Sequence, residues 1–279
     1  MGLRRSIYKS PAQLRAMVEP GLITAAALDA ARALIAPGVT TGQLDAAASA
    51  VITSRGAVSN FQMVRGYRHT ICTSVNEQVV HGIPGGRVLE PGDIVSVDAG
   101  AEYQGWNGDS AFSVVIPDDS RPDVVAARQR LSDVTEGSLW AGIAALASAK
   151  RIGEIGSAIQ GYIDDHAPDG GYGILRDYVG HGIGRKMHES PSVFNYRVSD
   201  LGPEVKPGLV LAIEPMVVIG DQATFIEDDD WTVSTVDGTA GSHWEHSVAV
   251  HDDGIWVLTA PDGGAAGLAP FGITPRPIG

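Results

Sequence analysis

The sequence lacks the features that mark several classes of protein. It contains one cysteine, Cys72, among 279 residues, which excludes an internal disulfide and any metal site built from several thiolates. No stretch approaches the roughly 18 consecutive apolar residues that a membrane-spanning helix needs. The first ten residues, MGLRRSIYKS, carry charge but no apolar segment follows them, so we expect no secretory signal.

Positive charge is scarce as well. Lysine and arginine together number 20, against 33 aspartates and glutamates, and the formal net charge is −13. Because so acidic a chain repels phosphate backbones, we expect no nucleic-acid-binding face. The hydrophobic fraction of 44% is typical of a soluble protein with a substantial core. We therefore expect a cytoplasmic protein that makes no membrane contact.

Helix and strand signals alternate along the chain. The expected helices cover 11–35 with a break at Pro20-Gly21, 41–54 after a cap at Thr40 or Thr41, 123–148, and 151–166. Strand-like runs cover 94–98, 111–116, 209–213, 216–219, 247–251 and 255–258. Paired helices with intervening hairpins predict an α+β fold. Residues 261–279 are rich in glycine and proline, which favours a tail that lies over the surface or is disordered.

Two aspartates fall in what reads as a single hairpin, DIVSVDAGAEYQGWNGDSAFSVVI. If Tyr103 and Gln104 form its turn, Asp98 and Asp109 lie directly opposite each other, with Cβ atoms about 4.5–5.5 Å apart. Two carboxylates at that separation repel unless a cation or a proton lies between them. The alternative, that either aspartate caps a turn, stays open.

Three further segments place chemically active side chains in apolar surroundings. YVGHGIGRKMHESP holds His181 between glycines, with His188 seven residues later, although either could be a core histidine beside a turn. Glu214 ends an apolar run in LAIEPM, and Glu245 lies in another, SHWEHSVAV, where a bare carboxylate is unfavourable without a partner. Four carboxylates and one imidazole suit a pair of divalent metals that bridge one hydroxide.

The motifs VDAG–GDSAF, YVGHGIGRKMHESP, AIEPM, DDWTVSTVDGT, WEHS and ICTSVNEQVVHGIPG together resemble type I methionine aminopeptidases. The resemblance covers about residues 8–260 and is closest to the actinobacterial branch. It implies a pita-bread fold, in which a curved antiparallel sheet carries two helix pairs on its outer face. It also implies one catalytic domain over 1–260, followed by the tail at 261–279.

The resemblance further implies a dinuclear site and a reaction. Asp98 would bind one metal, Asp109 and Glu245 would bridge both, and His181 and Glu214 would complete the shell of the other. The two divalent ions would be Co, Mn, Fe or Zn, and their hydroxide would attack the first peptide bond to release the initiator methionine.

Other residues would assist this reaction. Glu214 would move the proton, His188 would stabilise the oxyanion, and His81 would contact the scissile amide. The substrate side chain would meet a wall formed by Phe61, Val64, Tyr67, Cys72, His81, Met187, His188 and Trp231. The implied partners are the N-termini of peptides and nascent proteins, with the ribosome as a candidate partner and the enzyme as a monomer.

The segment around this wall departs from the family pattern. Met63-Val64 stands where a Gly-Tyr or similar pair is usual, and Arg65 and Arg68 are also unusual. A divergent paralogue, with altered N-terminal preference or inhibitor resistance, is therefore an alternative. A non-catalytic pita-bread binding protein and a metal-free hydrolase of the creatinase type are further alternatives, although both leave the complete ligand set unexplained.

Overall fold

The computed structural model describes residues 6–279. Its helices are α1 (Pro11–Arg32), α2 (Thr41–Ser54), η1 (Phe61–Met63), α3 (Pro122–Leu146), α4 (Gly153–His166), α5 (Ala265–Leu268) and η2 (Ala269–Phe271). Its strands are β1 (Val58–Ser59), β2 (Ile71–Val75), β3 (Gln78–Val80), β4 (Ile94–Tyr103), β5 (Trp106–Val115), β6 (Gly173–Ile174), β7 (Gly180–Gly182), β8 (Glu189–Val193), β9 (Val210–Ile213), β10 (Met216–Val218), β11 (Thr224–Ile226), β12 (Val233–Thr235), β13 (Gly241–His243), β14 (Glu245–His251) and β15 (Gly254–Val257).

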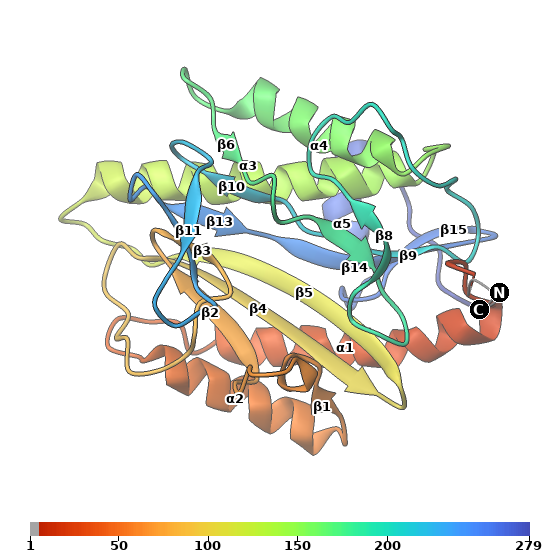
Figure 1. Cartoon of the computed structure of the whole chain (residues 1–279), viewed down its shortest axis with the longest axis horizontal. Helices are drawn as coiled ribbons and strands as arrows, with labels where there is room; N and C mark the ends of the chain where they lie inside the picture. The colour runs from red at the N-terminus through yellow and green to blue at the C-terminus, as the bar shows by residue number, and fades with distance from the viewer. Residues whose placement is uncertain (1–5) are drawn as a thin grey trace.

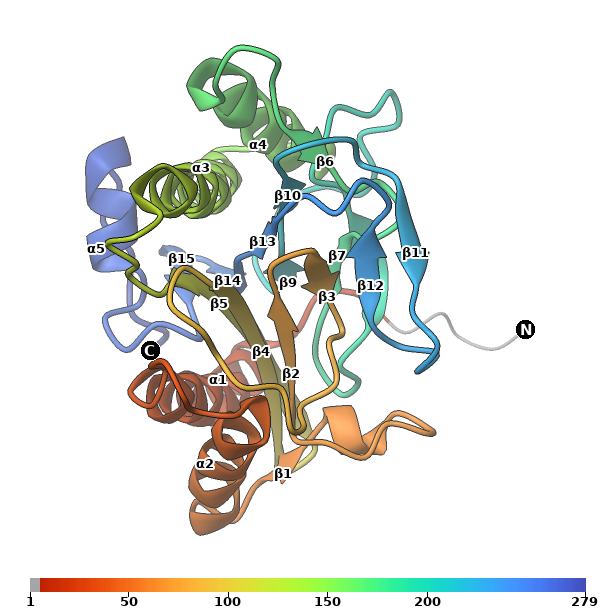
Figure 2. The ribbon, with the colours of Figure 1, turned by 90° about the vertical axis from the view of Figure 1, so that its left-hand side faces the viewer.

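A nine-stranded antiparallel sheet forms the centre of the molecule. Its main path runs β1-β4-β5-β14-β9-β7-β8, with β2 paired to β4 and β15 paired to β14. The helix pairs α1–α2 and α3–α4 cover one side of this sheet (Figures 1 and 2). Of the two three-stranded sheets, β13-β10-β6 contacts α3 and shares its core, whereas β11-β12-β3 lies away from the helices (Figure 2). The α+β architecture expected from the sequence is therefore confirmed, with both helix pairs on the same outer face.

Strand alternation decides which residues reach which face. On β4, the side chains of Val95, Val97 and Ala99 pack into the core beneath α1 and α2. Because neighbouring residues on a strand point to opposite faces, Asp98 must point away from the helices. The second helix pair covers the other half of the sheet with a core of its own, which includes Leu139, Ile143, Ile155, Ile159, Leu211 and Val248.

The expected break in the first helix does not occur. Helix α1 begins with a capping box between Ser10 and Gln13 and continues through Pro20 to Arg32. Proline removes one N–H donor from a helix, here the one that would reach the Ala16 carbonyl. Separately, the Thr24 hydroxyl adds a bond to the Pro20 carbonyl at 2.9 Å. A Cβ on Gly21 would collide with the carbonyl oxygen of Leu258. Close packing onto the sheet thus holds together a helix that the local sequence predicts to break.

The register of the β4–β5 hairpin also differs from the expectation. Tyr103 pairs with Trp106, so Gln104 and Gly105 form the turn, and Asp109 faces Gly100 rather than Asp98. Gln104 and Gly105 have φ of 52° and 78°, the positive values that favoured two-residue hairpin turns require. The shift moves the pairing by two residues, and an even shift leaves both aspartates on one face.

The remaining expected elements are present. Thr40 caps α2 through a capping box with Gln43, and α3 and α4 lie where helices were expected. All six strand-like runs fall on β4, β5, β9, β10, β14 and β15.

Residues 261–279 contain regular structure that their composition does not predict. They form α5 and η2, and Leu268 is buried in the core with α3. The Arg276 N–H donates to the Ile255 carbonyl at 3.0 Å, so this segment lies against β15. Between residues 6 and 279, no helix combines the length and apolar character required to cross a membrane. The expectation about a secretory signal concerns in part residues 1–5, which lie outside the described residues.

Candidate metal centre

The residues that sequence reasoning singled out line one cavity on the concave side of the sheet. The cavity has a volume of about 130 Å³. Its lining consists of Asp98, Asp109, His181, Glu214 and Glu245 at one end, with Phe61, Val64, Tyr67, Cys72, His81, Met187, His188 and Trp231 around the rest.

Neighbouring strands bring the carboxylates together around a small residue. Ala111 on β5 pairs with Asp98 on β4 and also with Glu245 on β14. Asp109 lies two residues before Ala111 and therefore on the same face. Because Ala111 carries only a methyl group, the space between the three longer acidic side chains stays open. Three separated segments of the chain thus meet in one row across the sheet.

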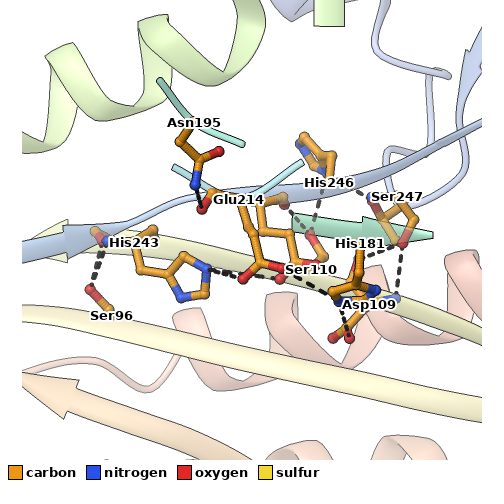
Figure 3. A network of polar contacts seen from close by, with 12 residues as sticks. Ser96, Asp109, Ser110, His181, Asn195, Glu214, His243, His246 and Ser247 are labelled. Carbon is orange, nitrogen blue, oxygen red and sulfur yellow. Dashed lines mark hydrogen bonds and ion pairs between the residues drawn. The ribbon is translucent and has the colours of Figure 1, made fainter. Parts of the chain in front are cut away.

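A second part of the cluster comes from β7 and β9. His181 on β7 pairs with Ala212 on β9, and Glu214 follows the end of β9. His181 Nε2 lies 3.4 Å from Glu214 Oε1 and 3.9 Å from Asp109 Oδ2 (Figure 3). The Nδ1 of the same ring lies 3.0 Å from the Gly182 carbonyl oxygen. A carbonyl can only accept, so Nδ1 carries the proton and Nε2 presents its lone pair to the carboxylates.

Candidate ligand atoms overlap in three groups. Within each group the oxygen and nitrogen atoms lie within 4.8 Å of one another. The groups are Asp98, Asp109 and Glu245; His181, Glu214 and Glu245; and Asp109, His181 and His188. Because Asp109 and Glu245 each occur in two groups, the geometry allows two neighbouring cation positions that share carboxylates.

The electrostatics of the cluster favour the binding of positive charge. Burial raises the pKa of Asp98 to about 8 and holds the pKa of Asp109, Glu214 and Glu245 well above their ordinary values. The carboxylates also raise one another's pKa. Burial lowers the pKa of His181 to about 4, so this imidazole is neutral.

The cluster also holds oxygen atoms without partners. Among residues 6–279, Asp98 Oδ1, Asp109 Oδ1 and Glu245 Oε1 are buried and accept no hydrogen bond, and no lysine or arginine forms an ion pair with these side chains. Unpaired buried carboxylates are unfavourable unless a cation neutralises them. An oxygen-rich set with one neutral imidazole suits a hard or borderline divalent metal. The residues present therefore fit the metal that the sequence predicts.

The backbone around the cluster is held by buried hydroxyl and amide groups. Ser247 Oγ donates to the Asp109 carbonyl at 2.8 Å, and Ser110 Oγ donates to the Glu245 carbonyl at 2.6 Å (Figure 3). Asn195 Nδ2 donates to the Glu214 carbonyl at 3.0 Å. These contacts fix the strand segments from which three of the acidic side chains project.

Sequence reasoning missed one member of the cluster, His243. Its ring is 1% exposed, and Nε2 lies 3.7 Å from Glu214 Oε2 and 3.9 Å from Glu245 Oε2 (Figure 3). Burial lowers its pKa to about 3, and Nε2 has no hydrogen-bond partner within the described residues. The signal was present in SHWEHS, because His243 and Glu245 are two residues apart and so share one face of an extended segment.

Two other histidines border the cavity. The His188 ring lies edge-on to His181, with centroids 4.4 Å apart, and its pKa is lowered by burial. His81 packs edge-on against Tyr178, and burial lowers its pKa to about 4. Both imidazoles are therefore neutral and can each donate one hydrogen bond toward the cavity.

The rest of the wall is apolar and aromatic. Tyr67 packs edge-on against Trp231, with ring centroids 5.1 Å apart, and its hydroxyl donates to the Ile71 carbonyl. Burial raises the pKa of Cys72 well above its ordinary value, which keeps the side chain as a neutral thiol. Phe61, Val64 and Met187 complete the cluster that encloses this end.

Of the residues that depart from the expected pattern, Val64 lines the cavity, whereas Met63 is 64% exposed and Arg65 and Arg68 lie on the surface. The altered segment therefore changes one position of the wall and several positions outside it.

Comparison with known proteins identifies the family. Residues 15–252 match the sequence model of Metallopeptidase family M24. The chain belongs to metallopeptidase family M24. It is 44% identical to Methionine aminopeptidase 1 of Mycobacterium tuberculosis, over 92% of this chain and 96% of that protein. It is 41% identical to Methionine aminopeptidase 1 of Bacillus subtilis, over 91% of this chain and 98% of that protein.

Solved structures agree with this assignment. A methionine aminopeptidase from Thermotoga maritima superposes with a TM-score of 0.83 at 35% identity, over 90% of this chain and 98% of that one. A prolidase from Pyrococcus horikoshii has a TM-score of 0.69 at 19% identity, over 91% and 63%, which shows a shared fold alone. The pita-bread fold expected from the sequence is confirmed. As a member of this family the protein is a metal-dependent peptidase that binds divalent metal.

Proposed function

We propose that the protein is a methionine aminopeptidase that removes the N-terminal methionine from peptides and nascent proteins. One observation carries the proposal: a cluster of four buried carboxylates and a neutral imidazole opens directly onto a small aromatic slot. The cluster supplies hydrolytic chemistry, and the enclosed slot receives one side chain. The names of the relatives with 37–44% identity support the same activity.

Five side chains would hold two divalent ions. Asp98 would bind one ion, Asp109 and Glu245 would bridge both, and His181 and Glu214 would complete the second site. Two ions bound in this way supply an activated hydroxide and polarise the peptide carbonyl. Co, Mn, Fe and Zn are all compatible with a set of carboxylates and imidazole.

The remaining polar residues would act on the substrate. Glu214 would move the proton between the nucleophile and the leaving amine. His188, with its neutral ring beside His181, would donate to the oxyanion, and His81 would contact the scissile amide from the other side of the cavity.

The slot suits an unbranched thioether. Sulfur packs favourably against ring edges, and Phe61, Tyr67 and Trp231 provide aromatic surface within one enclosed cluster, beside Cys72 and Met187. A closed apolar end selects against charged and large polar side chains, because these would lose their hydration there.

The alternative of altered preference rests on Val64, which replaces a larger residue of the family pattern in the wall. Turnover of Met-Ala-Ser should be compared with that of peptides that begin with Ala, Leu or Pro, at a defined concentration of one metal. Fastest cleavage of Met-Ala-Ser is expected. If another first residue is cleaved faster, the proposed specificity is wrong. Asp109→Ala serves as the control, and activity that survives both this change and chelation would rule out the metal mechanism.

We further place the chain close to the actinobacterial enzymes, which the match to Mycobacterium tuberculosis supports. We assign residues 1–260 to one catalytic domain, and 261–279 to a C-terminal segment that packs on it through Leu268. The substrates, newly made N-termini, imply that the enzyme acts in the cytoplasm, with the ribosome as its candidate partner. The proposal that it is a monomer rests on the family resemblance.

A further inference from the structure

A second depression lies directly beside the catalytic cavity. This groove has a volume of about 810 Å³, and His188 lines both it and the cavity. Residues 6–9 before α1 form one wall of the groove, and the segment from Arg185 to Ser190, which covers the end of the β7–β8 loop and the start of β8, lines the other. The groove is therefore an open continuation of the site at the position of one candidate catalytic residue.

Contacts within the protein hold the walls in place. Lys9 Nζ lies 3.0 Å from Glu189 Oε2, and the Lys186 N–H donates to Glu189 Oε1 at 3.1 Å. The Arg185 guanidinium lies 3.9 Å above the Trp106 ring and donates to the carbonyl oxygens of the β4–β5 turn. The groove thus exists before any ligand arrives, which lowers the entropy lost on binding.

The groove is basic although the protein as a whole is acidic. Glu189 is the acidic residue among its described lining, and both of its oxygens are already engaged. Arg185 bonds to neutral carbonyl groups, and neither it nor Lys186 forms an ion pair within residues 6–279. Two uncompensated positive charges therefore border the groove of a chain with net charge −13.

A polypeptide substrate needs such a path. If the first side chain fills the slot, the residues after the cleaved bond must leave the cavity, and the groove begins at its rim beside His188.

From this geometry we infer that the groove binds the segment of the substrate that follows its second residue, and that Arg185 and Lys186 make it select acidic side chains there. This inference rests on the proposed aminopeptidase function and adds a substrate class to it.

The test compares three peptides that begin Met-Ala-Ser and continue with Asp-Asp-Gly, Gln-Gln-Gly or Lys-Lys-Gly. We expect kcat/KM to fall in that order, with roughly a three- to tenfold span between the acidic and basic peptides at low salt. The span should shrink as ionic strength rises, because salt screens exposed charges.

Two charge-reversal variants distinguish the effect of charge in the groove from the effect of the protein's net charge. Lys186→Glu should abolish or reverse the order, whereas Lys150→Glu, at an exposed position outside the groove, should preserve it. Equal kcat/KM for the three peptides, or equal effects of the two variants, would overturn the inference. The tripeptide Met-Ala-Ser lacks the residues at which the three peptides differ, so failure to cleave it would instead refute the proposed function.

Discussion

Asp98→Asn is expected to stabilise the metal-free protein at neutral pH. Burial raises the pKa of Asp98 from 3.8 to about 8 in the folded state. A raised carboxyl pKa gives stability that is complete below the unfolded pKa and is lost as pH rises through the folded pKa. At pH 7 the difference spans about three pH units, and at about 1.4 kcal/mol per unit the free energy of unfolding falls by on the order of 4 kcal/mol.

The amide introduced by Asp98→Asn would not ionise, so this loss disappears in the variant. Removal of the carboxyl also relieves its neighbours, because Asp98 raises the pKa of Asp109, Glu214 and Glu245. A buried amide without full hydrogen bonding costs about 1–3 kcal/mol at every pH, so the informative quantity is the slope of stability against pH. Between about pH 4.5 and 7.5 the wild type should lose stability more steeply with pH than the variant. The difference in slope should correspond to about one or more extra protons bound by the folded state.

The assay is urea unfolding of the chelated protein across that pH range, with Asp165→Asn, an exposed position, as the matched control. The free energy of unfolding of the control should stay within about 0.5 kcal/mol of the wild-type value at each pH, so that the two slopes agree. Added divalent metal should then stabilise the wild type more than Asp98→Asn. Equal pH slopes for wild type and Asp98→Asn would show that burial does not hold this carboxyl protonated, and the electrostatic argument for the metal would fail.

Substitutions at three further positions test other parts of the structure. Gly21→Ala should lower the free energy of unfolding by about 1–3 kcal/mol in urea titrations, since its Cβ would collide with the Leu258 carbonyl oxygen; an increase, as helix propensity alone predicts, would contradict the close packing. Glu245→Gln should reduce kcat/KM more than about a hundredfold and remove the metal-induced rise in Tm while the fold is kept by circular dichroism. His243→Leu should weaken Mn²⁺ binding in calorimetry by about ten- to a hundredfold, because the His243 Nε2 lies 3.7 Å from Glu214 Oε2 in the wild type. His243→Gln, which keeps a donor, should restore part of the affinity. Unchanged Mn²⁺ binding in both variants would exclude a positioning role for His243.

The face of the sheet that carries the candidate ligands could be predicted from the sequence, because the alternation of side chains along a strand tolerates a two-residue error in strand register. Placing the hairpin turn at Tyr103-Gln104 instead of Gln104-Gly105 displaced Asp98 and Asp109 by two residues relative to each other. Side chains alternate with a period of two along a strand, so both stayed on one face. An error of one residue would have separated them, and the predicted site would have been lost.

The errors arose where distant contacts override local preference. Pro20 predicts a helix break from its own chemistry, yet α1 continues because Gly21 packs tightly on the Leu258 backbone. Leu268 lies in a stretch whose composition favours disorder, yet it is buried in the core. Neither contact can be inferred from neighbouring residues, because each joins segments far apart in the chain.

The unusual residues between Met63 and Arg68 lie where they can alter substrate preference but not the candidate metal ligands. Of the altered segment, Val64 reaches the cavity, whereas Arg65 and Arg68 are exposed. The candidate ligands project from five strands or strand ends that pair across one sheet, and their positions do not depend on this segment. Divergence is therefore expected to affect which substrates are preferred before it affects hydrolysis itself. Exposed charges act mainly through long-range attraction that salt screens, so preferences due to surface arginines should weaken at high ionic strength, and those due to Val64 should persist.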